Sequence, residues 1–207
     1  MSALPAGITP AGTGKAGRSE DVKWNILGHV YWLKAQSEEC FAFETLDPPG
    51  TFVPPHVHPT QDEFIYMLEG TFDLYLDGAW TKAGPGDLVR MPKGIPHGYY
   101  NRQDKQARAL FWVTPARRLR ALFDQLHDLG DPEEVVRRSA AHEVDFLPPG
   151  SVPGGVTSAP QFAPLHKPVV QQASPENANG HRKARVHPAS PHVAVYTDAF
   201  RLRCGSF

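Results

Sequence analysis

Residues Gly50 to Gly70 read GTFVPPHVHPTQDEFIYMLEG, and they contain the clearest structural pattern in the chain. The pattern predicts two strands joined by a four-residue polar turn, Pro59 to Asp62. Because side chains two positions apart on a strand project from the same face, His56 and His58 are expected to point together into the interior. Glu63 begins the second strand, where its carboxylate is expected to lie close to both imidazoles across the strand pair.

A second stretch supplies a fourth donor. In Pro92-Lys-Gly-Ile-Pro-His97, a turn rich in proline and glycine precedes a histidine at the start of another predicted strand. Such a turn allows a strand remote in sequence to aim one imidazole at the same point. We therefore predict one metal site with His56, His58, Glu63 and His97 as ligands. Three neutral imidazoles and one carboxylate leave open positions on an octahedral ion, which suits Fe, Mn, Ni, Co or Cu and only partly excludes Zn.

The other histidines are not expected to bind this metal. A lone histidine on an apolar face is usually a hydrogen-bonded core residue or a surface group. This interpretation applies to His29, His127 and His142. The spacings of His166, His181, His187 and His192 match no compact metal-binding pattern.

Short segments rich in β-branched and aromatic residues occupy the middle of the chain and are separated by Gly, Pro and Asp. This composition is typical of a β-sandwich or barrel. The predicted strands are Asn25 to Lys34, Cys40 to Leu46, Phe52 to His58, Glu63 to Leu68, Thr71 to Leu76, Asp87 to Met91, His97 to Tyr100 and Ala109 to Thr114. Acidic residues followed by glycine end two of them and predict tight hairpins. The strand order expected from these turns is an antiparallel meander.

After Pro115 the apolar residues recur at the helical period, with Leu119, Leu122, Phe123 and Leu126 on one stripe. Asp131 and the proline that follows it provide a helix cap and a first helical residue, so a second helix is predicted there. We expect two helices within about 116–143, packed beneath the barrel.

Composition divides the chain of 207 residues into one domain and two flanking segments. Residues 1–20 are small and polar and are expected to form a flexible arm, residues 21–150 the domain, and residues 151–207 a proline-rich, mostly disordered tail. A net charge of -1 argues against nucleic acid as a partner. No apolar run is long enough to span a membrane and no leader pattern is present, so we expect a cytoplasmic protein that binds a small molecule.

Two motifs carry a family resemblance. The first is Gly50-x5-His56-x-His58-x4-Glu63-x6-Gly70, and the second is Gly86-x5-Pro92-x-Gly94-x2-His97-x3-Asn101. Together they resemble the paired motifs of the cupin superfamily, and every motif position is filled. The resemblance implies a mainly β fold, a double-stranded β-helix or jelly-roll barrel, with a metal held by the four predicted ligands. From Asp21 to Gly150 the chain looks like bacterial quercetinase-like cupins.

This resemblance implies a metal-dependent dioxygenase that acts on a small aromatic or enolic substrate and consumes dioxygen. Glu63 is then expected to serve as a metal ligand and as a general base toward a substrate hydroxyl. Two alternatives use the same ligands: a cupin isomerase, epimerase or lyase acting on a sugar or keto acid, and a protein that senses a metal or ligand without catalysis. A phosphosugar substrate would favour a cluster of basic residues, of which only Arg90 and Lys93 lie near the motifs.

The predicted strand after the turn has apolar residues on both faces. Ile65 and Met67 share the face of Glu63 and are expected to line the interior, whereas Phe64, Tyr66 and Leu68 face outward. An outward apolar face suggests cover by helices or by a partner. We therefore expect a homodimer.

Overall fold

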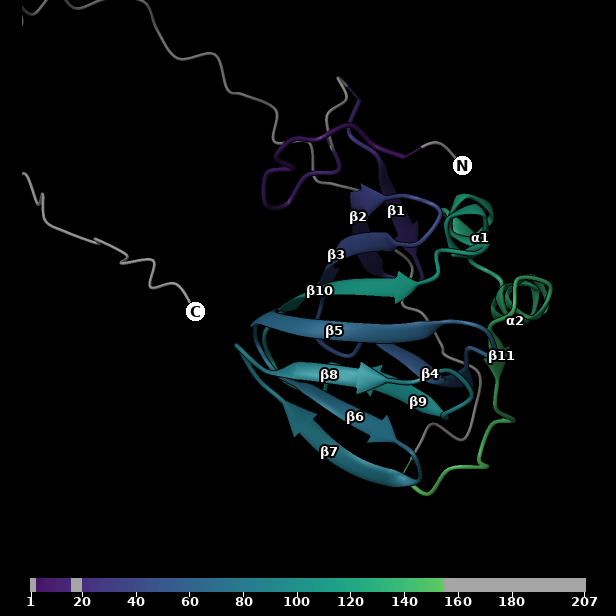
Figure 1. Ribbon diagram of the computed structural model, residues 1–207. Coiled ribbons are helices and arrows are strands. Elements are labelled where there is room, and N and C mark those ends of the chain that lie inside the picture. The colour runs from purple at the N-terminus through teal and green to yellow at the C-terminus, as the bar shows by residue number, and fades with distance from the viewer. Residues whose placement is uncertain (1–2, 16–19, 155–207) are drawn as a thin grey trace, which may run out of the picture. The chain divides into compact units, whose positions relative to one another are not determined.

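The computed structural model describes residues 3–15 and 20–154, which form two antiparallel sheets (Figure 1). The six-stranded sheet has the order β1-β2-β3-β10-β5-β8, and the five-stranded sheet has the order β11-β4-β9-β6-β7. The strands are β1 Lys23–Ile26, β2 His29–Gln36, β3 Phe41–Asp47, β4 Phe52–Val57, β5 Asp62–Glu69, β6 Phe72–Leu76, β7 Ala79–Ala83, β8 Leu88–Met91, β9 His97–Tyr100, β10 Ala107–Thr114 and β11 Asp145–Phe146. All described residues fall within the unit Met1–His166, and the part of the predicted tail beyond residue 154 lies outside the described residues.

The barrel confirms the predicted fold class, but the predicted meander is wrong. Hairpin pairing joins β1 with β2, β2 with β3, and β6 with β7. In contrast, β10 lies between β3 and β5, and β9 lies between β4 and β6. Turn residues indicate where the chain reverses and say nothing of which distant strand becomes the neighbour. These crossings between the two sheets produce the jelly-roll arrangement.

The structure also divides one predicted strand and contains a strand that was not predicted. The expected single strand Asn25 to Lys34 is a hairpin, because Leu27 and Gly28 take positive φ angles of 51° and 89° between β1 and β2. Two consecutive residues with positive φ form a tight hairpin turn whose twist matches that of the two flanking strands. Strand β7 was missed because most of its residues are exposed, so the sequence shows no alternation of apolar and polar positions.

The core fills the space between the two sheets with alternate side chains of each strand. On β5, Ile65 and Met67 are buried, whereas Tyr66 is 41% exposed and Leu68 is 40% exposed. The alternation predicted for this strand is therefore confirmed. The largest fully buried aromatic side chains are Phe41, Phe72 and Phe111.

Both predicted helices are present, α1 over Leu119–Leu126 and α2 over Pro132–Ala140. The four residues of the predicted apolar stripe on α1 are all buried. The Asp131 side chain caps α2 by accepting a hydrogen bond from the backbone N–H of Glu133, and Pro132 occupies the first helical position. Amphipathic periodicity and capping chemistry are local signals, which is why sequence reasoning located both helices.

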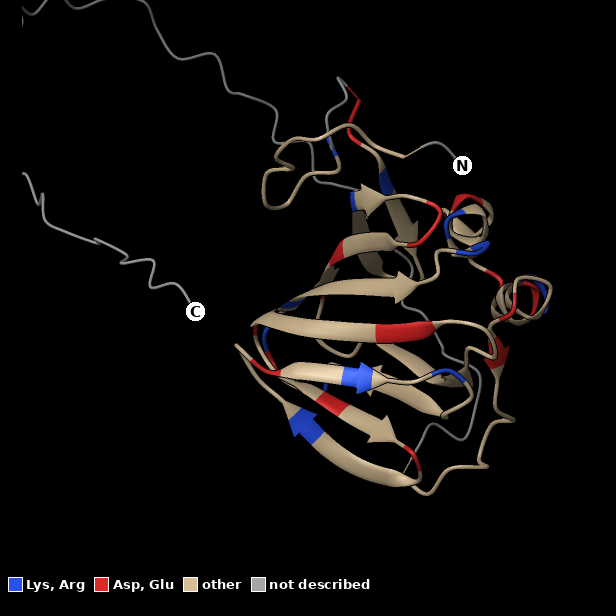
Figure 2. Cartoon of the chain, in the orientation of Figure 1, with Lys and Arg blue, Asp and Glu red and all other residues tan. Residues whose placement is uncertain are grey.

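The helices lie at one end of the barrel, where α1 contacts β1 and α2 contacts β11 (Figure 1). Charged side chains are spread over helices and loops, and the strands carry few of them (Figure 2). Within residues 3–15 and 20–154, neither helix has the length and apolar character that crossing a membrane requires.

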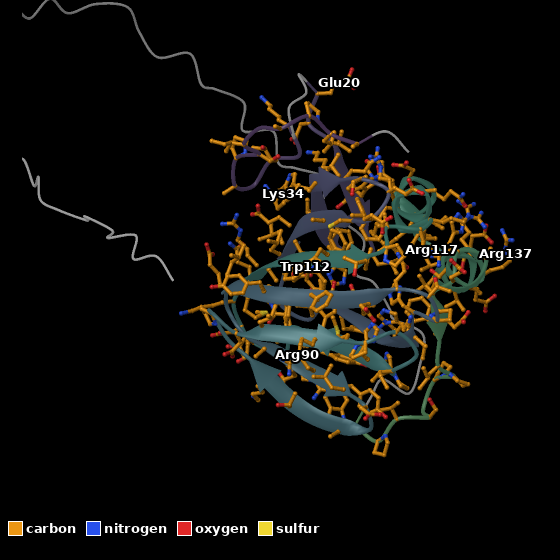
Figure 3. The ribbon with its side chains drawn as sticks, viewed as in Figure 1. Glu20, Lys34, Arg90, Trp112, Arg117 and Arg137 are labelled. Atoms are coloured by element: carbon orange, nitrogen blue, oxygen red, sulfur yellow. The ribbon has the colours of Figure 1, made fainter. Side chains whose placement is uncertain are left out.

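The outer face of the six-stranded sheet carries aromatic residues that the helices leave uncovered. Phe64 and Trp112 stack with their ring centroids 5.1 Å apart, and Trp112 and Arg90 lie on the sheet face turned toward the viewer (Figure 3). Leu88 on the neighbouring strand is 52% exposed. The expected homodimer stays a prediction, and this face is the surface that it would bury.

The N-terminal segment, expected to be a flexible arm over residues 1–20, lies against β2 over its described part. Leu4 donates its backbone N–H to the carbonyl of Gln36 at 2.9 Å, and Lys34 Nζ donates to the carbonyls of Pro10 and Thr13 at 2.6 and 2.8 Å. These contacts are polar and join distant parts of the chain, so composition alone did not indicate them. Residues 3–15 form neither helix nor strand.

Glu44 connects this segment to the barrel. Its carboxylate accepts the backbone N–H of Gly12 at 3.1 Å and pairs with Lys34 at 2.6 Å and with Arg108. Burial alone would raise the pKa of Glu44, but the hydrogen bonds from Lys34, Gly12 and Arg108 hold it below the ordinary value of 4.5. A carboxyl with a lowered pKa stabilises the fold above its unfolded pKa and loses that contribution as the pH falls through its folded pKa.

We predict that Glu44→Gln lowers the free energy of unfolding by about 2 kcal/mol at neutral pH, because the partly buried cations of Lys34 and Arg108 lose the negative charge that they pair with. The difference from the unsubstituted protein should shrink as the pH falls below about 4.5. Glu69→Gln is the control, because Glu69 also pairs with Arg108 but its side chain is 55% exposed. Urea denaturation at several pH values measures both; equal losses for the two variants would contradict the assignment.

Candidate metal centre

The structure brings the four predicted ligands together. His56 lies on β4, His58 follows that strand, Glu63 lies on β5, and His97 begins β9. Pairing of β4 with β9 places His56 opposite His97. One nitrogen or oxygen atom of each residue lies within 4.8 Å of the others, and all four residues are buried. The barrel brings His97 next to Glu63 and His56, which lie 34 and 41 residues earlier in the sequence, and so creates one compact donor set.

Glu63 Oε2 faces the Nε2 atoms of all three histidines. The distances are 3.0 Å to His97, 3.4 Å to His58 and 4.0 Å to His56. The side chain of Glu63 is 8% exposed, so water does little to screen these charges.

The opposite ring nitrogen of each histidine is held by an acceptor. His56 Nδ1 lies 2.9 Å from the carbonyl oxygen of Pro54, and His97 Nδ1 lies 2.8 Å from that of Ile95. A carbonyl oxygen only accepts, so both Nδ1 atoms must carry the proton. In each neutral ring, Nε2 then directs its lone pair toward Glu63, as a metal ligand requires.

Gln61 orients His58 in the same way and was not singled out by the sequence. Its Nε2 donates to the carbonyls of Pro115 and Ala116 at 3.0 and 2.9 Å, which leaves its Oε1 to accept from His58 Nδ1 at 3.0 Å. Gln61 is fully buried, although it lies in the turn interpreted as polar. The two carbonyls that fix its amide group lie more than 50 residues away, so the sequence carried no signal for this role.

Electrostatics favour a cation between these atoms. Burial lowers the pKa of His56 well below its ordinary value, and nearby His97 and His58 lower it further. Burial likewise lowers the pKa of His58. Burial alone would raise the pKa of Glu63, but the hydrogen bond with His97 and the nearby His58 charge lower it to about 2. Lone pairs and a carboxylate thus face one another at short distance.

The donor set therefore fits a divalent transition metal. Without a cation, His97 needs a second proton to bond Glu63, because its Nδ1 proton is already directed at Ile95. A metal ion replaces that proton and accepts all four donors. Three imidazole nitrogens and one oxygen suit the borderline divalent ions and give no single identity.

The cluster opens onto a cavity of about 100 Å³. His56, His58 and Glu63 line it from the barrel, and residues of α1 and α2 line it from the helical end. Most other lining residues are apolar, with Phe43, Phe52, Phe111, Phe123 and Phe146 among them. Ile65 and Met67, expected at the cavity, are instead buried in the core and are not among the lining residues.

His29 has the core role predicted for it and also lines the cavity. Its Nδ1 lies 2.5 Å from Asp47 Oδ1, and its Nε2 lies 3.2 Å from the carbonyl oxygen of Phe52. His127 and His142 lie outside the metal-ligand cluster, with His142 Nδ1 bonded to the carbonyl of Arg138. The four histidines after residue 154 lie outside the described residues.

Tyr99 and Tyr31 also line the cavity, and their hydroxyl oxygens are 3.0 Å apart. Burial raises the pKa of Tyr31 well above its ordinary value, and the Asp47 charge raises it further. The neighbouring Tyr100 turns the other way and stacks on Phe52 at 5.2 Å. Tyr99 therefore lines the cavity, whereas Tyr100 does not.

Comparison with known proteins identifies the domain. Residues 43–113 match the family model of the cupin domain. Protein SchB of Streptomyces halstedii is 33% identical over 67 residues, which cover 32% of this chain and 49% of SchB. The polyketide synthase CurC of Streptomyces cyaneus is 31% identical, with 32% and 44% covered. Germin-like protein subfamily 2 member 1 of Arabidopsis thaliana is 37% identical, with 28% and 29% covered.

The chain spans about half or less of the length of these curated relatives. Their names also point to different biological settings. The matches therefore show that residues 43–113 are similar to a cupin domain, and the choice of substrate rests on the chemistry of the site.

We predict that His58→Ala and His97→Ala abolish metal retention while the barrel stays folded, because the apolar core does not depend on these side chains. Metal content after dialysis should fall from about one ion per chain toward zero. His127→Ala is the control, because that side chain is 44% exposed and lies outside the cluster. Unchanged metal content in both cluster variants, with folding checked by circular dichroism, would rule out the ligand assignment.

We further predict that Gln61→Leu weakens metal binding by about 10- to 100-fold, the range expected when the partner that orients a ligand is lost. Competition with a chromophoric chelator measures this affinity with Zn. Gln103→Leu is the matched control, because Gln103 bonds Asp73 and does not line the cavity. Equal affinity in the Gln61 variant and the control would show that His58 is oriented without this contact.

Proposed function

We propose, from the premise that residues 43–113 form a cupin domain, that this protein is a metal-dependent enzyme acting on a small aromatic or enolic substrate. The observation that carries the proposal is the direction of the donors. Three imidazole Nε2 atoms and Glu63 meet beside one buried cavity walled mainly by apolar and aromatic side chains. Such a cavity favours a flat, apolar ligand with oxygen atoms at the metal end.

The charge of the cavity argues against the isomerase alternative. Among the described residues that line it, none is a lysine or an arginine. Arg90, which the sequence offered for binding a phosphosugar, lies on the outer face of the sheet (Figure 3), and Lys93 is exposed. A phosphosugar that binds the ion through its sugar oxygens would therefore bury its phosphate without a lysine or arginine partner, at substantial cost.

The role of Glu63 further limits the choice of substrates. A bound divalent ion would supply Lewis-acid stabilisation of negative charge on a substrate oxygen. A Glu63 carboxylate that coordinates the ion has an electron pair engaged at the metal, so its first role is to hold the ion and it would be a weak proton acceptor. Transfer of a proton to Glu63 then requires a hydroxyl that is already acidic, as in an enol or a phenol.

The size of the cavity favours compact substrates. An engineered protein cavity of about 150 Å³ binds benzene, so about 100 Å³ is the scale of a single ring. A three-ring flavonol exceeds this space unless the helices move. Catechols and cyclic β-diketones are therefore better candidates than flavonols.

The reaction that we propose is dioxygenation of such an enol or phenol. A second candidate is an oxygen-independent ring closure or isomerisation of the same enol. The similarity of part of this domain to CurC, named as a polyketide synthase, favours an enolic, polyketide-like substrate for either reaction. The two candidates use the same donors and differ in whether dioxygen is consumed.

We predict dioxygen uptake, measured with an electrode, when protein loaded with Fe, Mn, Co, Ni or Cu meets a catechol or a cyclic β-diketone. Uptake should be lost in Glu63→Ala and retained in Glu69→Ala, whose side chain is on the surface. Substrate loss without oxygen uptake would favour the second candidate. If verified metal-loaded protein consumes neither compound, the catalytic proposal fails and the sensing alternative gains support.

A further inference from the structure

Two tyrosine hydroxyls form a second polar point in the cavity that holds the metal donors. Tyr31 lies on β2 and Tyr99 on β9, and their hydroxyl oxygens are 3.0 Å apart. Both side chains are buried and line the same cavity as His56, His58 and Glu63. One sheet thus contributes Tyr31, and the other contributes Tyr99 from the strand that begins at His97.

The tyrosine pair has more hydrogen-bond donors than its mutual bond uses. Two hydroxyls carry two protons, and their mutual hydrogen bond uses one of them. Within residues 3–15 and 20–154, each of these hydroxyls bonds only the other, so the second O–H has no protein acceptor there. A buried O–H without an acceptor costs about 1–3 kcal/mol. The pair therefore presents one donor that a ligand oxygen or a water molecule can satisfy.

Packing holds both rings in place. Tyr31 lies between the rings of His29 and Phe123, at centroid distances of 5.7 and 5.2 Å. Tyr99 packs against Phe72 at 4.9 Å and against Phe111. His29 is itself fixed by Asp47 and by the carbonyl of Phe52. A donor held in this way loses little entropy when it binds a ligand.

One small cavity contains both polar points. Its volume of about 100 Å³ is on the scale of one aromatic ring, and the metal donors and the tyrosine pair share its wall. A ring whose oxygen atoms meet the metal therefore places its opposite side within the same small space as the tyrosines. An oxygen atom on that side of the ring could accept a hydrogen bond from the tyrosine pair.

We propose that Tyr31 and Tyr99 determine specificity: the O–H that their mutual bond leaves over donates to an oxygen atom on the ligand side opposite the metal. The preferred ligand is then a single ring with oxygen atoms at both ends. This inference rests on the proposed function, because it takes the other end of the ligand to lie at the metal.

Kojic acid and allomaltol test the inference as matched probes. Both are one-ring hydroxypyranones that chelate metals, and kojic acid carries a hydroxymethyl group where allomaltol carries a methyl group. Calorimetry on the full chain loaded with Zn, which adds no redox chemistry, measures the two dissociation constants. We expect kojic acid to bind about tenfold more tightly than allomaltol, the scale of one buried hydrogen bond.

The variants assign that preference to the tyrosines. The double variant Tyr31→Phe with Tyr99→Phe should bind the two probes about equally. Each single variant keeps one hydroxyl that has lost its tyrosine acceptor, so it should still bind kojic acid more tightly than allomaltol. If the double variant does not fold, the comparison of the two probes with the unsubstituted protein still decides whether a donor is present. Tyr75→Phe is the control, because Tyr75 packs on Trp80 and does not line the cavity.

The outcomes separate this inference from the proposed function. Equal binding of the probes by the unsubstituted protein, or a preference that survives in the double variant, overturns the role of the tyrosines alone. In that case His58→Ala would still abolish binding of both probes, and the metal-centred site would stand. If neither probe binds the Zn-loaded protein, the inference and the site on which it rests both fail.

Discussion

The Nδ1 atom of each of the three imidazole rings is held by a hydrogen-bond acceptor, and the rest of the site depends on this constraint. Pro54, Ile95 and Gln61 each place an acceptor at an Nδ1 atom. A buried ring nitrogen that faces an acceptor must carry a proton, so each neutral ring has only its Nε2 lone pair to direct at Glu63. Burial removes water as an alternative partner. The orientation of these rings thus turns an ordinary β-barrel interior into a place suited to a cation.

The barrel and its helices are linked through the same constraint. Gln61 joins His58 to the carbonyls of Pro115 and Ala116, which immediately precede α1. Movement of the segment that contains Pro115 and Ala116 would therefore change the orientation of the His58 ring. The cavity that the helices help to line is also the space into which the metal donors open. The hydrogen bonds of Gln61 consequently connect the barrel, the orientation of His58 and the segment before the helices that line the cavity.

Sequence reasoning predicted what depends on local spacing and failed where distant partners decide. The period of two on β5 and of 3.6 on α1 identified their buried faces, and motif spacing brought His56, His58, Glu63 and His97 together. The strand order was wrong because pairing of β9 with β4 and β6 joins distant segments. The roles of Gln61 and Tyr31 were missed for the same reason: their partners are 54 to 68 residues away.

X-ray absorption spectroscopy of the metal-loaded protein tests the central claim most directly, because it observes the ligand atoms themselves. The account predicts, for Zn, three imidazole nitrogens and one carboxylate oxygen at about 2.0–2.2 Å, with the multiple-scattering pattern of imidazole rings. A sulfur ligand near 2.3 Å, or fewer than three imidazoles, would contradict the claim that the fixed Nε2 atoms and Glu63 together hold the ion.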